Sequence, residues 1–174
     1  MPCPGADPEG DGARGKRFRS HWQYGDMAKY KVSRSIDIDA PASVVFDIIA
    51  DPARHSEIDG SGSVGGQTFG PDRLGPDTSF GVDMRMYGVP YRMSNQVVEF
   101  EEGRRLVWKT MGPQRWGYEL SDLPDGGTRV KETFDYSRGP SFWYVLTGFP
   151  RRNAVSIENT LLRLRELAET ENRV

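Results

Sequence analysis

The sequence has few of the side chains that build disulfides and metal centres. It holds one cysteine, Cys3, and two histidines, His21 and His55, among 174 residues. A single cysteine cannot form a disulfide within the chain, so the fold does not depend on oxidation. A zinc site built by the protein usually takes three or four cysteine or histidine ligands, so we expect no metal centre.

The sequence also lacks a long apolar run and an excess of one charge. Its longest apolar run, Phe142 to Leu146, is far shorter than the roughly 18 to 20 residues of a membrane helix, and its start does not resemble a signal peptide. Lysine and arginine number 23 and aspartate and glutamate 25, a net charge of −2, which gives no general attraction to nucleic acid. We therefore expect a cytoplasmic protein with no transmembrane segment and no nucleic-acid partner.

A phosphate-binding loop is absent as well. The segment 60–66 is rich in glycine, but no Lys-Ser or Lys-Thr pair follows it as in a nucleotide-binding loop. We expect no nucleotide or other cofactor.

The first 26 residues differ in composition from the rest of the chain. They are rich in proline and glycine and show no apolar periodicity, so burial cannot offset the entropy of ordering them. We predict a disordered N-terminal extension over 1–26 and one domain over 27–174, a length typical of a single domain. Met27 stands where this pattern changes, and we expect it to be the natural start.

Beyond this segment, the apolar residues follow strand and helix periods. Alternation predicts a strand at 30–38, and Asp39 and Asp51, each followed by a proline within two residues, are the expected N-caps of two short helices. Further strands are predicted at 78–87, 91–101, 105–111, 114–120 and 128–137.

A long amphipathic helix is predicted at the C-terminal end. Its apolar stripe, widened by Val155, Leu162 and Leu167, follows spacings of three and four through Ala154, Ile157, Leu161, Leu164 and Ala168. The fold class is α+β: a curved antiparallel sheet needs a cover for its apolar face, and this helix supplies it. A sheet that wraps around a helix leaves room for a cavity between them.

Five stretches of sequence resemble one known superfamily. They are Ile38–Asp47 (IDAPASVVFD), Ala50–Pro52 (ADP), Val98–Trp108 (VEFEEGRRLVW), Trp116–Leu120 (WGYEL) and Gly126–Phe134 (GGTRVKETF). In this order, with the final helix, they resemble the START/birch-pollen-allergen-like helix-grip superfamily (SRPBCC), and within it the polyketide cyclase/dehydrase-like group, over about 29–170.

The resemblance implies a fold and a kind of ligand. It implies a helix-grip fold, with a six- to seven-stranded antiparallel sheet wrapped around a long C-terminal helix and two short helices after the first strand. It also implies an internal cavity for a hydrophobic or amphipathic small molecule. It implies no particular reaction, because members range from lipid carriers to cyclases and the fold does not fix the function.

Strand alternation predicts which side chains line this cavity. In the strand 91–101, Val98 and Phe100 set an inward phase that places Arg92 and Gln96 inside, whereas Met93 and Val97 favour the opposite phase. The predicted ligand-binding residues are Met84, Met86, Arg92, Gln96, Trp108, Trp116, Tyr118, Glu132, Phe134 and Trp143.

Three residues are candidates for acid–base chemistry. Glu132 shares a strand face with Val130 and Phe134, and burial there would raise its pKa and suit it to proton transfer or to a ligand hydroxyl. The alternative is a structural partner such as Arg92 or a tyrosine hydroxyl, or exposure at a strand edge. The resemblance implies that His55 and Asp59 lie at the rim of the pocket, where they form either an acid–base pair or an ordinary solvated helix end.

Three hypotheses for the function follow. The first is a binding protein for a lipid or a polyketide-like compound. The second is a cyclase or dehydratase acting on a poly-carbonyl substrate, in which Arg92 or Tyr118 holds the enolate oxygen. The third is an interaction module built on the apolar segment 141–150, which is alternatively a lid over the pocket, the start of the final helix, a membrane contact or a dimer contact. The sequence is compatible with both a monomer and a homodimer.

Overall fold

The computed structural model describes residues 30–86, 88–138, 146 and 148–173, without the side chains of 66–68, 86 and 149. The expected extension 1–26, the expected start at Met27 and the segment around Trp143 lie outside the described residues, and so does the side chain of Met86.

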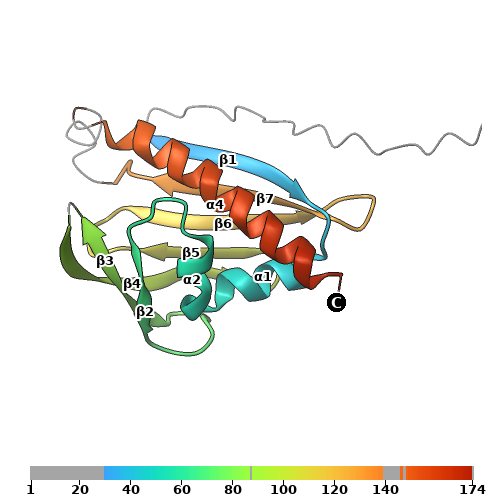
Figure 1. Cartoon of the computed structure of the whole chain (residues 1–174), viewed down its shortest axis with the longest axis horizontal. Coiled ribbons are helices and arrows are strands. Elements are labelled where there is room, and N and C mark those ends of the chain that lie inside the picture. The colour runs from blue at the N-terminus through green and yellow to red at the C-terminus, as the bar shows by residue number, and fades with distance from the viewer. Residues whose placement is uncertain (1–29, 87, 139–145, 147, 174) are drawn as a thin grey trace, which may run out of the picture.

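Seven antiparallel strands form one curved sheet in the order β1-β7-β6-β5-β4-β3-β2 (Figure 1). The strands are β1 (Lys31–Ile38), β2 (Val64–Phe69), β3 (Ser79–Met86), β4 (Val89–Glu101), β5 (Arg105–Lys109), β6 (Arg115–Asp122) and β7 (Thr128–Asp135). The first strand pairs with the last along its whole length, from Lys31 opposite Asp135 to Ile38 opposite Thr128. The predicted curved antiparallel sheet is confirmed, and β1 and β2 are its two edges.

The helices lie on the concave side of the sheet (Figure 1). They are α1 (Ala42–Ala50), the 3-10 turn η1 (Pro52–Arg54), α2 (His55–Ile58) and α4 (Phe149–Glu171). Helix α4 runs along β1 and β7, with α1 and α2 packed beside it. This arrangement is the helix-grip fold. Among the described residues, no helix is both long enough and apolar enough to cross a membrane.

One of the two expected helix caps is present. Asp51 accepts a hydrogen bond from the backbone N–H of Ala53 at 2.9 Å and so begins η1. The expectation for Asp39 was wrong, because the N-cap of α1 is Pro41, which offers no side-chain acceptor.

The core forms between the sheet and the apolar face of α4. The side chains of Ile157, Leu161 and Leu164 have no exposed surface. Val155 and Leu162 do not widen this stripe as predicted: they are 58% and 37% exposed, because they lie on the flank of the helix that faces away from the sheet. Helix α1 completes the core with Val45, Phe46, Ile48 and Ile49.

Strand β2 was not predicted, because its glycines read as a break in the chain. It is an edge strand that pairs only with β3. The two strands approach closely at Gly65, where a β-carbon would lie 2.8 Å from the carbonyl oxygen of Asp83. Glycine is required here by the close approach of two backbones.

An irregularity in β4 reverses the phase that was assigned to its first half. Val97 pairs with Trp108 and Glu99 pairs with Val107, so one extra residue of β4 lies between these pairs. A β-bulge of this kind changes which side chains share a face. Met93, Asn95 and Val97 therefore share the concave face with Phe100, and Arg92 and Gln96 lie on the opposite, convex face.

Candidate functional site

Five of the predicted lining residues come together on the concave face of β5, β6 and β7. Tyr118 is paired with Glu132, and Trp116 is paired with both Phe134 and Trp108. The rings of Trp116 and Phe134 lie 5.0 Å apart, and those of Trp108 and Tyr118 lie 5.8 Å apart. Trp108 and Trp116 remain half-buried although they face the concave side. Glu132 is thus a carboxyl group among aromatic rings.

Glu132 has no exposed surface. Its Oε1 accepts a hydrogen bond of 2.7 Å from Nε1 of Trp116, whereas its buried Oε2 has no hydrogen-bond partner among the described residues. Burial raises the pKa of Glu132 to about 8, partly offset by the Trp116 hydrogen bond and by Tyr118. The Tyr118 hydroxyl is close enough to influence the carboxyl but does not complete the hydrogen bonding of Oε2. At neutral pH the carboxyl is mostly protonated.

Glu132 therefore has structural partners, and one of them, the Tyr118 hydroxyl, is of a kind considered from the sequence. The indole of Trp116 was not considered, and Arg92, which was, instead pairs with Asp83 on the convex face, with 3.2 Å between Nε and Oδ1. Burial and the neighbouring Glu132 raise the pKa of Tyr118 well above its ordinary value, so its hydroxyl stays protonated.

His55 lies at the border of this aromatic cluster. Its ring stacks on Trp108 at 5.6 Å and meets the ring of Phe80 edge-on at 5.5 Å. Its Nε2 lies 3.0 Å from the carbonyl oxygen of Ile49. Burial lowers the pKa of His55, so its imidazole is neutral at pH 7.

Asp59 caps the loop that leads into β2. One carboxylate oxygen accepts hydrogen bonds from the N–H and the hydroxyl of Ser61, at 2.9 and 2.6 Å, and the other accepts from the N–H of Val64 at 2.8 Å. The negative charge of Asp59 also contributes to the raised pKa of Glu132. His55 and Asp59 thus each have structural partners, and an acid–base role for them stays a prediction.

Asn95 was missed as a candidate. It lies on the concave side of β4 with only 5% of its surface exposed, and its Oδ1 has no hydrogen-bond partner among the described residues. An asparagine in phase with Met93 and Val97 is the signal that a correct strand phase would have revealed.

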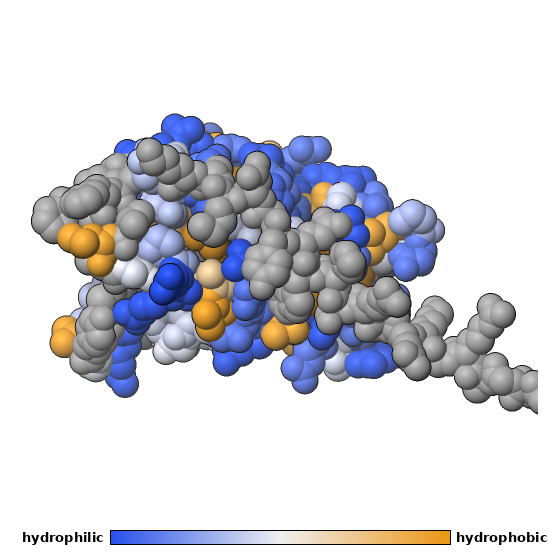
Figure 2. Space-filling model, turned by 90° about the horizontal axis from the view of Figure 1, so that it is seen from above, coloured by the Kyte–Doolittle hydropathy of each residue, from blue (hydrophilic) through white to orange (hydrophobic). Residues whose placement is uncertain are grey.

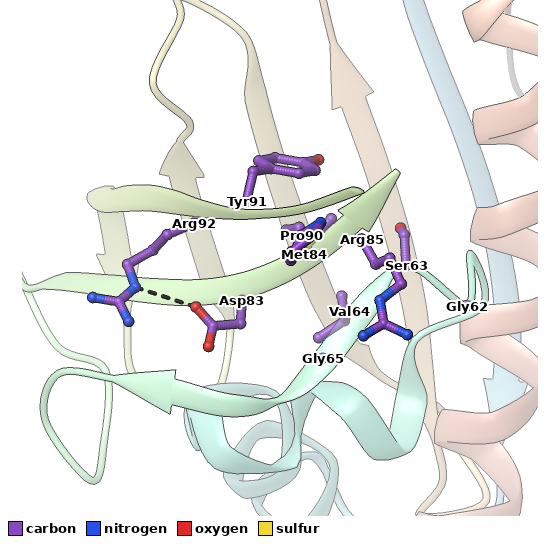
Figure 3. A pocket seen from close by; sticks show the side chains of 10 residues that line it. All are labelled: Gly62, Ser63, Val64, Gly65, Asp83, Met84, Arg85, Pro90, Tyr91 and Arg92. Atoms are coloured by element: carbon purple, nitrogen blue, oxygen red, sulfur yellow. Dashed lines mark hydrogen bonds and ion pairs between the residues drawn. The ribbon is translucent and has the colours of Figure 1, made fainter. Parts of the chain in front are cut away.

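A pocket of about 640 Å³ opens at the β2–β3–β4 end of the sheet (Figure 3). It includes Met84 and Arg92 from the predicted set. Its other lining residues are Gly62, Ser63, Val64, Gly65, Asp83, Arg85, Pro90 and Tyr91. In the described part of the chain, no three histidine, cysteine, aspartate or glutamate side chains gather as a metal site would require.

Sequence comparison finds one family and an uncharacterized relative. The family model described as "polyketide cyclase / dehydrase and lipid transport" matches residues 29–169. The uncharacterized protein Rv0088 of Mycobacterium tuberculosis is 38% identical over 144 residues, which cover 80% of this chain and 64% of that protein. The chain thus spans about 64% of the length of the curated relatives it matches.

Solved bacterial structures share the fold at low sequence identity. NE0264 from Nitrosomonas europaea has a TM-score of 0.62 at 19% identity, covering 84% of this chain and 99% of that one. A protein from Rhodobacter sphaeroides has a TM-score of 0.66 at 14% identity, covering 86% and 99%. TTHA0849 from Thermus thermophilus has a TM-score of 0.61 at 19% identity, covering 81% and 98%.

Proposed function

The chain belongs to the polyketide cyclase/dehydrase and lipid transport family, and from this premise we propose that it binds a hydrophobic or amphipathic small molecule against the concave face of its sheet. The observation that carries the proposal is Oε2 of Glu132, a fully buried oxygen without a hydrogen-bond partner among the described residues. Leaving such a group unsatisfied costs about 1 to 3 kcal/mol. A ligand that satisfies it recovers part of that cost.

The protonation state of Glu132 selects the polar group of the ligand. Since its pKa is about 8, the carboxyl at neutral pH offers an O–H donor. This donor suits a carbonyl or hydroxyl oxygen and disfavours an anion, which would keep its charge in a buried site. Trp108, Trp116 and Phe134 offer aromatic faces for the body of the ligand. The best-supported ligand is therefore an aromatic or polyketide-like compound with a neutral oxygen function.

Two probes of nearly equal shape test this proposal. 2-Acetylnaphthalene carries a carbonyl group, and 2-ethylnaphthalene has a methylene group in its place. We expect quenching of tryptophan fluorescence to show that the wild type binds the ketone about fivefold to tenfold more tightly, the value of about one hydrogen bond. In Glu132→Leu this preference disappears, whereas the control Glu119→Leu, a partly exposed residue on the convex face, retains it. Absence of binding of both probes, or an unchanged preference in Glu132→Leu, would overturn the proposal.

An enzymatic role is the second candidate, and the pKa of Glu132 favours it. A carboxyl group that titrates near 8 exchanges protons readily near neutral pH. In its carboxylate form Glu132 would take a proton from the carbon beside a ligand carbonyl, and the Tyr118 hydroxyl would donate a hydrogen bond to the enolate oxygen that forms. Arg92 lies on the convex face and has no part in this scheme.

Proton exchange at carbon tests the second candidate without knowledge of the natural substrate. In D₂O, we expect the wild type to replace the methyl protons of 2-acetylnaphthalene with deuterium, followed by NMR, at a rate that rises through an apparent pKa of about 8. Glu132→Gln lowers this rate to that of the buffer. Equal rates with wild type and Glu132→Gln would exclude this role and leave the binding proposal standing.

A further inference from the structure

The pocket at the β2–β3–β4 end combines an apolar wall with charged groups. Val64, Met84, Pro90 and Tyr91 supply the apolar surface, contributed by β2, β3 and β4. Figure 3 shows Val64 where the start of β2 faces the hairpin of β3 and β4, with Tyr91 on the other side of β4. A volume of about 640 Å³ lies within the range of small-molecule sites.

The charges of this pocket do not cancel. Arg92 is neutralised by Asp83, with 3.2 Å between Nε and Oδ1, and its guanidinium lies 3.7 Å from the ring centre of Phe69. Arg85 is exposed and makes no ion pair or side-chain hydrogen bond with any of the described residues. The pocket therefore carries one uncompensated positive charge on Arg85, whose guanidinium lies beside Ser63 and Val64 in Figure 3.

The loop that faces Arg85 is held in place by the rest of the fold. The backbone N–H of Arg85 donates to the carbonyl oxygen of Ser63 at 2.8 Å, and the carboxylate of Asp59 caps the loop from inside. The N–H of Gly60 donates to the hydroxyl of Thr160 on α4 at 3.0 Å. A rim fixed in this way reduces the entropy cost of binding a ligand.

From these contacts we propose that the pocket is a second binding site, for an amphipathic organic anion. Arg85 binds the carboxylate or phosphate group, and Val64 and Pro90, the strand partner of Arg85, contact the apolar body. A guanidinium forms paired, charge-assisted hydrogen bonds with either anion. The site differs in kind from Glu132, where a neutral oxygen function is favoured, and it does not depend on ligand binding there.

A second matched pair of probes tests this site. 1-Anilinonaphthalene-8-sulfonate is an amphipathic anion, and N-phenyl-1-naphthylamine has the same rings without the sulfonate. Measuring fluorescence at low salt, we expect Arg85→Gln to weaken binding of the anion about tenfold and to leave that of the neutral probe within twofold. Arg104→Gln, which removes an equal charge at the other end of the sheet, leaves both unchanged. An unchanged affinity for the anion in Arg85→Gln, or an equal loss in Arg104→Gln, would overturn the proposal.

Competition identifies the anionic group. Decanoate and decyl phosphate are each titrated against the bound sulfonate probe, with decanol as the neutral control. We expect at least one of the two anions to displace the probe from the wild type more effectively than decanol and to lose this advantage in Arg85→Gln; the stronger anion identifies the group. Displacement no better than that by decanol would overturn the proposal, and the 2-acetylnaphthalene test at Glu132 would be unaffected.

Discussion

At the scale of single residues, Glu132 combines two conditions that rarely persist together. Its side chain is fully buried, and only one of its two carboxyl oxygens has a hydrogen-bond donor. Alternation with Val130 and Phe134 predicted the burial. The donor, Trp116, was not predictable, because it depends on how β6 and β7 align, and that register is fixed by pairing along the whole strand.

The raised pKa of Glu132 makes the stability of the protein depend on pH. A carboxyl whose pKa rises from 4.5 to about 8 on folding is protonated only in the folded state between these values. Stability is therefore lost as the pH rises from 4.5 to about 8 and is constant beyond it. We expect Glu132→Gln to remove this loss. In this window the free energy of unfolding of the variant, relative to that of the wild type, then rises by at most about 1.4 kcal/mol per pH unit. Denaturant unfolding at several pH values measures it.

A substitution of Trp116 distinguishes titration of Glu132 from a general effect of pH on stability. The hydrogen bond from Trp116 lowers the pKa of Glu132, so Trp116→Phe should raise that pKa further and extend the loss of stability to higher pH. Parallel pH profiles for the wild type and Glu132→Gln would show that the buried carboxyl does not titrate as stated.

At the scale of elements, the spacing of apolar residues along the strands and helices predicted most of the fold and part of the site. The inward phases of β6 and β7 and the central apolar stripe of α4, though not its widening by Val155 and Leu162, were correct, because each element keeps one period along its length. In β4 the phase set by Phe100 does not extend to Gln96, because an extra residue lies between the pairs of Val97 and Glu99. Met93 and Val97 indicated the opposite phase, but a bulge that reconciles the two phases was not considered, so Asn95 was missed and Arg92 was misplaced.

The loop between α2 and β2 rests directly on α4, and glycine makes this contact possible. A β-carbon at Gly60 would lie 2.1 Å from the carbonyl oxygen of Ser156 and 2.4 Å from the backbone nitrogen of Thr160. Both are backbone atoms of a helix, so neither can yield easily. We expect Gly60→Ala to destabilise the protein by about 1 to 3 kcal/mol, the usual cost of overpacking, measured as a lower denaturation midpoint.

Gly75→Ala provides the control for the contact at Gly60. At Gly75 the nearest atom to a β-carbon is the Thr78 methyl at 3.9 Å, an ordinary van der Waals distance. Gly75→Ala should therefore leave the midpoint nearly unchanged. A Gly60→Ala protein as stable as Gly75→Ala would mean that the loop moves away from α4 at little cost.

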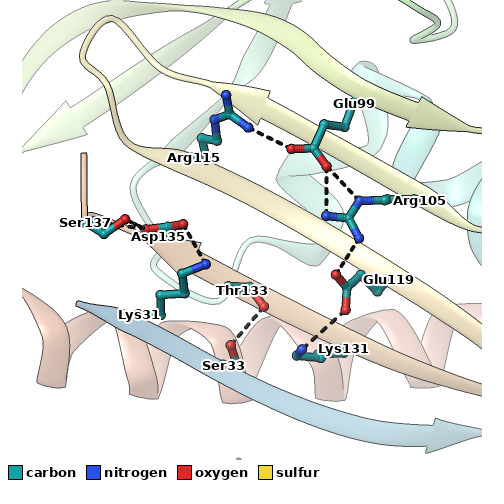
Figure 4. Close-up of polar contacts among 10 residues, drawn as sticks. All are labelled: Lys31, Ser33, Glu99, Arg105, Arg115, Glu119, Lys131, Thr133, Asp135 and Ser137. Carbon is teal, nitrogen blue, oxygen red and sulfur yellow. Dashed lines mark hydrogen bonds and ion pairs between the residues drawn. The ribbon is translucent and has the colours of Figure 1, made fainter. Parts of the chain in front are cut away.

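At the scale of the whole molecule, the two faces of the sheet have opposite chemistry. The concave face carries the aromatic rings and the core, whereas charged side chains link the strands on the convex face (Figure 4). The face seen in Figure 2 is mostly hydrophilic, with hydrophobic residues in small separate patches. Exposed large hydrophobic side chains in the described part of the chain are Val89, Met111, Leu146, Val155 and Leu162. Ligand binding is therefore expected on the concave side of the sheet and in the pocket at its β2–β3–β4 end.

The charges of the convex face form a ladder from β4 to β7. Glu99 pairs with Arg105 at 2.8 Å and with Arg115 at 2.7 Å, Arg105 also pairs with Glu119 at 2.8 Å, and Glu119 pairs with Lys131 at 3.3 Å. Each pair is partly exposed, so solvent screens it and its individual contribution is at most about 1 kcal/mol. The ladder adds modest stability and holds neighbouring strands in register.

Removing Glu99 tests this ladder, because one carboxylate serves two arginines. We expect Glu99→Gln to lower the free energy of unfolding by up to about 1 kcal/mol at low salt, measured by urea denaturation. At about 1 M salt the Debye length falls to about 3 Å, so the difference from the wild type should shrink. Asp72→Asn also removes one negative charge, but Asp72 makes no ion pair with the described residues, and it should show neither effect. A deficit in Glu99→Gln that is independent of salt would assign the loss to packing of the side chain rather than to its charge.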